Sequence, residues 1–400
     1  MFIGRERELS KLNKMYQSEM FEFAVLYGRR RVGKTTLIHE FMRDKEGIFY
    51  MSIEGTKKEN LQGLSKAVLS KNELQQNTAQ FRDFEALLEY IDDFVKTEKR
   101  MIIAIDEFPY LANLNPALLS VLQHLTDHRL KDGKLFLILC GSYMGFMEKE
   151  VLGAKSPLFG RRTAQLHMKA FDYKTSAELL GGFSKEEQAL LYGAFGGTAM
   201  YLRQISNDKS LKQNIMDIVL STTGYLYEEP LLLLRQEVQE PGTYCAIIEA
   251  IAGGASKANE IATKTGEPSA KCLKYINTLC ELGILYKETP FMEKATSRKS
   301  IYCITDWMFR FWYRYVSGNR TLLETDAQEV VWERKIVPDL NHYMGAVFEE
   351  ICKSYLLRKN STGELPLLFT EIGRWWGTDS ATHTQMEIDL IARDGNDYLV

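Results

Sequence analysis

The chain has 400 residues, of which 45% are hydrophobic and 26% charged, and it carries a formal net charge of −3. This composition is typical of ordinary globular domains and excludes the collagen-like and disordered classes. Because the net charge is small, any contact with nucleic acid must come from a local basic patch. No apolar run approaches about 18 residues, so the sequence predicts neither a membrane-spanning helix nor a membrane partner.

Six cysteines are present, none in a C-x-x-C pair, and most of them lie within apolar runs. We expect them to be reduced core residues, and not disulfide partners or zinc ligands. The N-terminal segment is charged from Arg5 onward and lacks the pattern of a secretory signal peptide. Together these features predict a cytoplasmic location.

The chain opens with FIGREREL, residues 2–9, which begins a predicted helix that runs to about Met20. The next stretch, Phe23–Tyr27, is apolar and predicts a buried strand, and Thr36–Phe41 predicts a helix. Between them, residues 28–35 read GRRRVGKT and fit the pattern G-x-x-x-x-G-K-[ST] at every fixed position. A strand, a glycine loop and a helix form the context of a phosphate-binding loop.

This loop predicts a site for Mg·ATP. Gly28 and Gly33 allow the backbone to curl so that amide N–H groups face phosphate oxygens, and the helix start adds unpaired N–H groups. Lys34 would reach the β- and γ-phosphates, and the Thr35 hydroxyl would bind Mg²⁺. The predicted nucleotide-binding residues are Gly28, Arg29, Arg30, Arg31, Val32, Gly33, Lys34, Thr35 and Thr36.

Two acids follow the next fully apolar strand pattern, Met101–Ile105. Such a strand is typical of a parallel sheet that is covered on both faces, and ligands bind at the carboxyl ends of its strands. Asp106 is placed to hold Mg²⁺ through water. Glu107 is placed to orient and activate the attacking water, which makes it a predicted catalytic residue.

Another apolar strand pattern, Leu135–Cys140, ends just before Ser142. Ser142 is a candidate contact to the γ-phosphate or the attacking water, and a helix cap or turn serine is an equal alternative. Arg161 and Arg162 stand on a turn before a predicted strand at residues 164–168. Either arginine could stabilise charge on the γ-phosphate, while a surface ion pair is the alternative.

Five segments, FIGREREL, GRRRVGKTT, IIAIDEFPYL, CGSYMGFM and SPLFGRRT, occur in this order and together resemble the prokaryotic STAND and archaeal-type ATPases. That family is a branch of the AAA-related P-loop ATPases, and the resemblance covers at least residues 1–205. It implies an α/β fold with a parallel P-loop sheet of the ASCE type, in strand order 5-1-4-3-2. It also implies an adenine site near Arg5, the sensor position at Ser142, and catalytic roles for Glu107 and for Arg161 or Arg162.

A small helical lid is predicted for residues 171–240. The segment GGTAMYL, residues 196–202, resembles the family's GG-x-P-x-YL, and Ala199 stands where the family's proline packs on the nucleotide. Residues 208–240 read as helical, with breaks at Pro230 and Pro241.

Residues 241–318 predict three helices, a strand, a polar tip and a second strand, which is the order of a winged helix-turn-helix. Cations in the third helix and the tip would contact the phosphates of double-stranded DNA. These cations are Lys271, Lys274, Lys294, Arg298 and Lys299. Winged helices also serve as spacers and protein docks, so DNA contact is one of two alternatives. The aromatic and basic run Met308–Tyr315 has helical spacing, which favours core packing over stacking on bases.

Residues 319–400 resemble the C-terminal domain that is often joined to these ATPases, which is similar to the PD-(D/E)xK nuclease fold. A predicted helix from about His342 carries Glu349, and a predicted strand at Glu387–Ala392 carries Asp389. The two acids match the helix acid and the strand acid of that fold and imply a Mg²⁺ or Mn²⁺ site. The E-x-K motif of the fold is not among the 400 residues, so the match is partial. An ordinary helix acid and a strand-edge charge are the alternative.

These patterns predict four domains: an ATPase core at 1–170, a lid at 171–240, a winged helix at 241–318 and a partial nuclease-like domain at 319–400. The predicted function is that of a Mg²⁺-dependent ATPase which binds ATP and ADP and acts as a nucleotide-controlled switch on DNA. The alternatives are an ATP-gated scaffold for a protein partner and an ATP-regulated, metal-dependent nuclease. The sequence does not indicate an oligomeric state.

Overall fold

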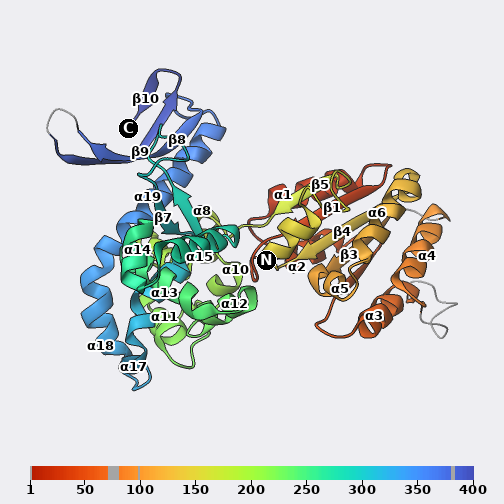
Figure 1. Ribbon diagram of the computed structural model, residues 1–400, viewed down its shortest axis with the longest axis horizontal. Coiled ribbons are helices and arrows are strands. Elements are labelled where there is room, and N and C mark those ends of the chain that lie inside the picture. Colours follow the sequence, from red (N-terminus) through yellow and green to blue (C-terminus); the bar gives the residue numbers. More distant parts are fainter. Residues whose placement is uncertain (1, 71–80, 98–99, 380–382) are drawn as a thin grey trace. The chain divides into compact units, whose positions relative to one another are not determined.

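The computed structural model describes residues 2–70, 81–97, 100–379 and 383–400. The chain forms two compact units, Met1–Lys169 and Ala170–Val400, each with hydrophobic core of its own (Figure 1). The finer division into lid, winged helix and nuclease-like domain stays a prediction. All six cysteines are free, and no helix of the described residues is long and apolar enough to cross a membrane.

The first unit is built on a five-stranded parallel sheet (Figure 1). The strand order is β2-β3-β4-β1-β5, which confirms the predicted order 5-1-4-3-2. Apolar runs form the three central strands, β3, β4 and β1, because both faces of the sheet are covered there. The strands are β1 (Glu22–Tyr27), β2 (Gly47–Met51), β3 (Met101–Asp106), β4 (Leu135–Gly141) and β5 (Ala164–His167).

Helices cover both faces of this sheet. One face packs against α1 and α2, and the other packs against α3, α4, α5 and α6. The alternation of strand side chains decides the face: Phe23 and Val25 belong to one core, and Ala24 and Leu26 to the other. The helices are α1 (Glu6–Tyr16), α2 (Lys34–Met42), α3 (Lys57–Leu69), α4 (Phe84–Thr97), α5 (Phe108–Leu114), α6 (Leu118–His128) and α7 (Met144–Phe146).

The first helix is shorter than the sequence predicts. It ends at Tyr16, and not near Met20. Arg100 donates hydrogen bonds to the carbonyl oxygens of Met15, Ser18 and Met20 at 3.0, 2.6 and 2.8 Å. A guanidinium about 80 positions away in the sequence therefore satisfies carbonyls that a longer helix would have used.

The second unit begins with short helices. They are α8 (Tyr173–Leu179), α9 (Lys185–Phe195), α10 (Ala199–Leu202), α11 (Leu211–Ile215) and α12 (Glu229–Glu237). The predicted breaks at Pro230 and Pro241 are present: each break lies just before its proline, which stands in the first turn of the next helix. Proline is tolerated there, since the first-turn amides have no partner within the helix.

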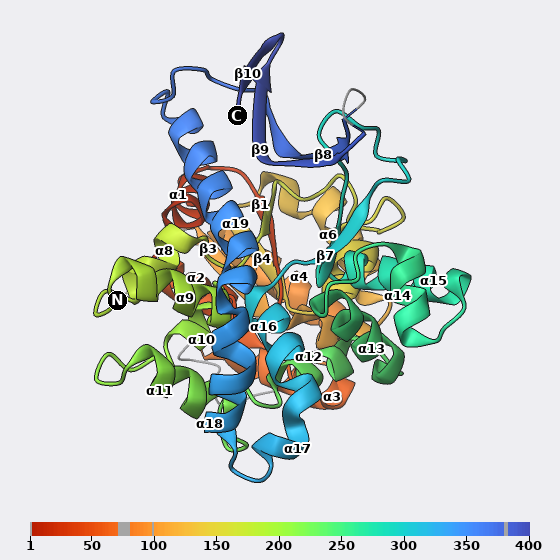
Figure 2. The same ribbon diagram turned by 90° about the vertical axis from the view of Figure 1, so that its left-hand side faces the viewer.

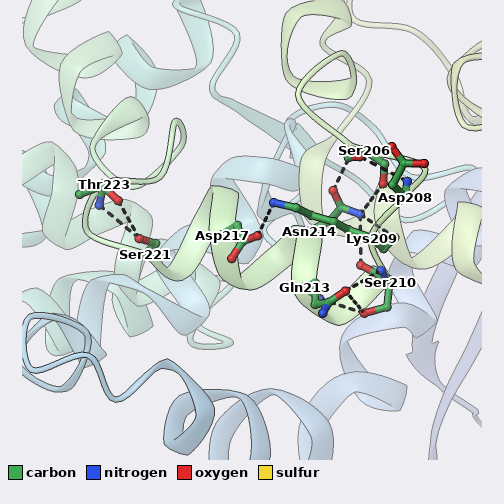
Figure 3. A network of polar contacts seen from close by, with 9 residues as sticks. All are labelled: Ser206, Asp208, Lys209, Ser210, Gln213, Asn214, Asp217, Ser221 and Thr223. Carbon is green, nitrogen blue, oxygen red and sulfur yellow. Dashed lines mark hydrogen bonds and ion pairs between the residues drawn. The ribbon is translucent and has the colours of Figure 1, made fainter.

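A polar network holds the turn before α11 (Figure 3). The buried amide of Asn214 accepts a hydrogen bond from the backbone of Ser206 and donates to the carbonyls of Ser206, Lys209 and Ser210. Ser210 and Gln213 form a capping box at the helix start. This network fixes the short, proline-free half of the 208–240 segment.

Three helices and a two-stranded antiparallel hairpin follow, in the order predicted for residues 241–318. They are α13 (Pro241–Ala252), α14 (Ala258–Thr265), α15 (Ser269–Glu281), β6 (Leu285–Glu288) and β7 (Ile301–Ile304). The next helix, α16 (Trp307–Tyr315), places most of its aromatic side chains in the core of the unit. Core packing therefore accounts for the aromatic run, and these buried rings are not available to stack on bases.

The C-terminal part carries a long helix and a three-stranded antiparallel sheet in the order β10-β9-β8. In Figure 2, α19 extends from beside α18 toward this sheet. The salt bridge between Arg314 of α16 and Asp339, which precedes α19, joins the two helical segments. The elements are α17 (Arg320–Leu323), α18 (Gln328–Val331), α19 (Leu340–Ser361), β8 (Glu371–Thr378), β9 (Gln385–Asp394) and β10 (Asp397–Leu399).

Candidate nucleotide-binding site

The glycine loop connects β1 to α2, and its two glycines are needed for different reasons. Gly28 approaches β5 so closely that an added Cβ would lie 2.2 Å from the carbonyl oxygen of Met168. Gly33 has open space around it but adopts φ +95°, a left-handed conformation that glycine favours. Arg31 is also left-handed, with φ +69°. The loop thus has the tight curl that the motif predicts.

Lys34 is buried at the first position of α2. Its ammonium donates hydrogen bonds to the carbonyl oxygens of Gly28 and Arg29 at 2.9 and 2.8 Å, so the loop closes around it. Burial lowers the pKa of Lys34, while the nearby acids Glu107 and Asp106 act in the opposite direction. The predicted phosphate-binding lysine therefore lies near the acidic pair, Asp106 and Glu107.

Asp106 ends β3 and lies beside the loop. The hydroxyl of Thr35 donates to Asp106 Oδ2 at 2.6 Å, and the backbone amide of Glu107 donates to Asp106 Oδ1 at 2.9 Å. The two segments meet because β4 lies between β1 and β3, and all three strands run in the same direction. Their carboxyl ends share one edge of the sheet. Thr36, by contrast, is exposed on α2.

Glu107 follows directly and adopts a left-handed backbone with φ +49°, at the N-cap of α5. Such a conformation is unusual for a residue with a side chain and often marks a functional position. Its carboxylate oxygen Oε1 accepts a hydrogen bond of 2.8 Å from the hydroxyl of Ser142, directly after β4. The structure therefore brings Ser142 to the acidic pair.

Sequence reasoning missed two residues of this site. Cys140 of β4 is fully buried, and burial together with the nearby Asp106 raises the pKa of its thiol. Tyr110 of α5 accepts a hydrogen bond of 2.9 Å from Arg30 of the loop. The sequence offered a signal only for Tyr110, which stands three positions after Glu107 and so one helical turn along.

Arg5 contacts the loop from the side of α1. Its buried guanidinium donates to the carbonyl oxygens of Val32 and Lys169 at 2.9 and 2.6 Å. Burial lowers the pKa of Arg5, and the neighbouring Glu8 acts in the opposite direction. Arg5 therefore holds the glycine loop against the end of β5. The predicted contact of Arg5 with adenine stays a prediction.

Arg161 and Arg162 both contact protein groups. Arg161 forms two hydrogen bonds with the carboxylate of Asp127, at 2.8 and 2.7 Å, which lower the pKa of that carboxyl. Arg162 donates to the side chain of Gln165 and to a backbone carbonyl. For Arg161 this is the ion pair that the sequence left open, and a catalytic role for either arginine stays a prediction.

The predicted C-terminal metal ligands, Glu349 and Asp389, line one cavity of about 300 Å³ within the second unit. Arg374 of β8 enters the same cluster, with its Nε 3.9 Å from Glu349, its Nη1 4.0 Å from Glu288, and an ion pair to Glu387. Within the described parts of the chain, no group of three or more His, Cys, Asp or Glu side chains could hold a metal ion. Glu349 already has the guanidinium of Arg374 as a nearby counter-charge, and the metal site stays a prediction.

Comparison with known proteins agrees with this architecture. Residues 2–205 match the family model of an ATPase domain found predominantly in Archaea, and residues 312–400 match a model of archaeal and bacterial proteins of unknown function. The chain belongs to the first of these two families, the ATPases found predominantly in Archaea.

One relative in sequence and two solved structures support this assignment. An uncharacterised protein of Methanocaldococcus jannaschii is 36% identical over 403 residues, which cover 99% of this chain and 85% of the relative. A Walker-type ATPase of Pyrococcus abyssi has a TM-score of 0.60 at 22% identity, covering 78% of this chain and 96% of that one. The ORC2 protein of Aeropyrum pernix, solved in ADPNP–ADP complexes, has a TM-score of 0.52 at 12% identity, covering 80% and 94%. These two structures share the fold.

Proposed function

We propose that this chain binds and hydrolyses ATP with Mg²⁺ at the loop of residues 28–36. The observation that carries the proposal is the 2.6 Å hydrogen bond between Thr35 and Asp106. It joins the loop to the acid-bearing strand, across 71 positions of sequence, at a point where Lys34 is also buried. A hydroxyl, a carboxylate and an ammonium at one point suit a triphosphate and its metal.

The oxygen atoms at this point fit Mg²⁺, which prefers hard oxygen ligands and retains several waters. Thr35 would bind the ion directly, and Asp106 would hold it through a water. When bound, Mg²⁺ neutralises charge on the β- and γ-phosphates.

The remaining residues supply the chemistry of hydrolysis. Glu107 would hold a water in line with the γ-phosphorus and accept its proton. As the water oxygen bonds to phosphorus, the bond from phosphorus to the bridging oxygen breaks, and that electron pair leaves with ADP. The products are ADP, inorganic phosphate and the proton that Glu107 passes on to solvent. Lys34 would exchange its two loop carbonyls for phosphate oxygens.

Steady-state ATP hydrolysis by the wild type, Lys34→Ala and Glu107→Gln tests this assignment. Lys34→Ala should lose nucleotide binding, and Glu107→Gln should bind ATP yet hydrolyse it at least ~10²-fold more slowly. Lys14→Ala, which changes an exposed lysine of α1, is the matched control. Equal turnover in all four proteins would overturn the proposal.

We further propose that the nucleotide state controls contact with double-stranded DNA through the elements of a winged helix. Lys271 and Lys274 are exposed on α15, the third helix, and Lys294, Arg298 and Lys299 are exposed between β6 and β7. Two of these cations form surface ion pairs, Lys271 with Glu267 and Lys299 with Glu293. Such exposed pairs are weak, so DNA phosphates can replace the acids.

Salt-dependent binding to duplex DNA, with ATP or ADP present, tests this step. Lys271→Gln and Lys274→Gln should each weaken binding and lower the salt dependence by about one released counterion. Lys209→Gln, in an exposed pair with Asp217, is the control. No binding of the wild type at low salt would remove DNA from the proposal.

A second candidate is an ATP-gated scaffold for a protein partner. The observation that favours it is an apolar groove of about 700 Å³ between α8 and α19, which is lined in part by the exposed ring of Tyr355. Large exposed apolar groups often mark protein contacts. If DNA binding fails, loss of a nucleotide-dependent association on Tyr355→Asp would support this candidate.

A further inference from the structure

Phosphoryl transfer places growing charge on the γ-phosphate oxygens, and an arginine is well suited to stabilise that charge. The sequence placed this role at Arg161 or Arg162. In the structure the charge of Arg161 is already paired with the carboxylate of Asp127 through two hydrogen bonds. A cation near Lys34 that has no carboxylate partner is therefore a better candidate for this role.

Arg30 is the third residue of the glycine loop, and it lies close to Lys34. Its positive charge contributes to the lowered pKa of the Lys34 ammonium, after the larger effect of burial. Arg30 is half-buried, and its Nη2 donates a hydrogen bond of 2.9 Å to the hydroxyl of Tyr110. No carboxylate among the described residues forms an ion pair with Arg30, so Tyr110 holds this guanidinium without neutralising it.

Tyr110 is in turn fixed to Glu107, the proposed base. Its backbone amide donates to the carbonyl oxygen of Glu107 at 3.0 Å, within the first turn of α5. The left-handed backbone of Glu107 starts that turn. One helical turn therefore carries both the proposed base and the hydroxyl that orients Arg30.

We propose that Arg30 is the cation that this chain itself supplies to the γ-phosphate, and that Tyr110 is the residue that positions it. This inference rests on the proposed ATPase function. Arg30 would stabilise the charge that builds on the γ-phosphate oxygens while the bond to the bridging oxygen breaks. Because this charge is greater in the transition state than in bound ATP, the effect belongs to kcat more than to KM.

The test compares kcat and KM for ATP in Arg30→Met, Tyr110→Phe and the double variant. Arg30→Met should lower kcat by about 10²-fold or more. Tyr110→Phe, which keeps the ring and deletes only the hydroxyl, should lower kcat about tenfold and leave KM within about threefold. The double variant should match Arg30→Met, because Tyr110 acts only through Arg30. Arg30→Lys should recover part of the loss, since it keeps the charge.

Two matched controls separate this effect from general damage. Arg7→Met removes an exposed arginine of α1, and Tyr50→Phe removes one hydroxyl hydrogen bond, to Asn60, on the edge strand β2. Both should keep the wild-type kcat. Binding of Mg·ADP, measured for every variant, reports whether the site is still folded.

Three outcomes would overturn the inference: wild-type kcat in Tyr110→Phe, wild-type kcat in Arg30→Met, or effects that multiply in the double variant. The failure of the proposed function looks different. In that case Lys34→Ala and Glu107→Gln would also show wild-type turnover, whereas failure of this inference alone leaves both of them impaired.

Discussion

At the scale of single residues, the site depends on oxygen atoms that two distant segments bring together. Thr35 starts α2 and Asp106 ends β3, and their side chains meet at 2.6 Å. The hydroxyl would bind Mg²⁺ directly, and the carboxylate would orient the water that also binds it. Loss of either group should therefore change the metal requirement of the reaction more than the fold.

We predict that Asp106→Asn raises the Mg²⁺ concentration for half-maximal ATPase activity by ~10–100-fold, the range seen when an outer-sphere partner of a metal is lost. Thr35→Ala should have a similar or larger effect, and Thr35→Ser should restore the wild-type value because it keeps the hydroxyl. Titration of MgCl₂ at fixed ATP measures this. A Thr35→Ser variant as impaired as Thr35→Ala would contradict the role of the hydroxyl.

The acidic cavity of the second unit gives a pH-dependent prediction. Burial raises the pKa of Glu349 above its ordinary 4.5, and although Arg374 lowers it, Asp389 and Glu387 add to the rise. A raised pKa means that the folded state favours the protonated acid, so this contribution is present below about pH 4.5 and is lost as the pH rises through the folded pKa.

We therefore predict that Glu349→Gln raises the unfolding temperature of the second unit at pH 7 and changes it little at pH 4. Calorimetry of the wild type and the variant at both values measures the difference. Glu324→Gln, which changes an exposed acid, serves as the control. A lower unfolding temperature of Glu349→Gln at pH 7 would mean that the pair with Arg374 outweighs burial.

At the scale of elements, the glycine loop makes a prediction that distinguishes its two fixed glycines. A Cβ at residue 28 would collide with the backbone oxygen of Met168, which cannot move without shifting β5. We predict that Gly28→Ala destabilises the first unit by about 3 kcal/mol. A Cβ at residue 33 would contact no other atom, so Gly33→Ala should destabilise the first unit through backbone strain alone, by about 1–2 kcal/mol. Urea unfolding without nucleotide tests the order, and a larger loss in Gly33→Ala would contradict it.

At the scale of the whole molecule, the chain has two units that bury separate cores. Among the described residues, the core of the second unit takes its members from Phe171 onward, and the cores of the first unit take theirs from residues up to Met168. Two separate cores should unfold in two transitions.

We predict that Mg·ADP raises the first unit's unfolding transition alone, by about 2.7 kcal/mol of stability at a hundredfold excess over Kd. The proposed nucleotide-binding residues, 28–36 with Asp106, all lie in that unit, so we expect the second transition not to move. In Lys34→Ala the shift should disappear. Differential scanning calorimetry measures both transitions, and a single transition that moves as a whole would contradict two independent units.

Much of the fold and part of the candidate site could be predicted from the sequence. Strands β1, β3 and β4 lie where apolar runs predicted them, because a strand buried on both faces needs an unbroken apolar segment. The loop and the acids Asp106 and Glu107 were recognisable, since phosphate binding demands fixed residue types at short spacing. The aromatic run of α16 was also predicted as core from its spacing.

Contacts between distant residues were decided only by the tertiary structure. The pairing of Arg161 with Asp127, the end of α1 under Arg100, and the bond from Arg30 to Tyr110 join residues 34 to 85 positions apart. Periodicity and local motifs report on neighbours within a few positions, so they contain no information on such pairs. The sequence by itself determined the P-loop class, the buried strands and the identity of the phosphate-binding loop. Which charged groups remain unpaired beside that loop was decided by the packing of strands and helices, because ion pairs form between whichever side chains the fold brings within reach.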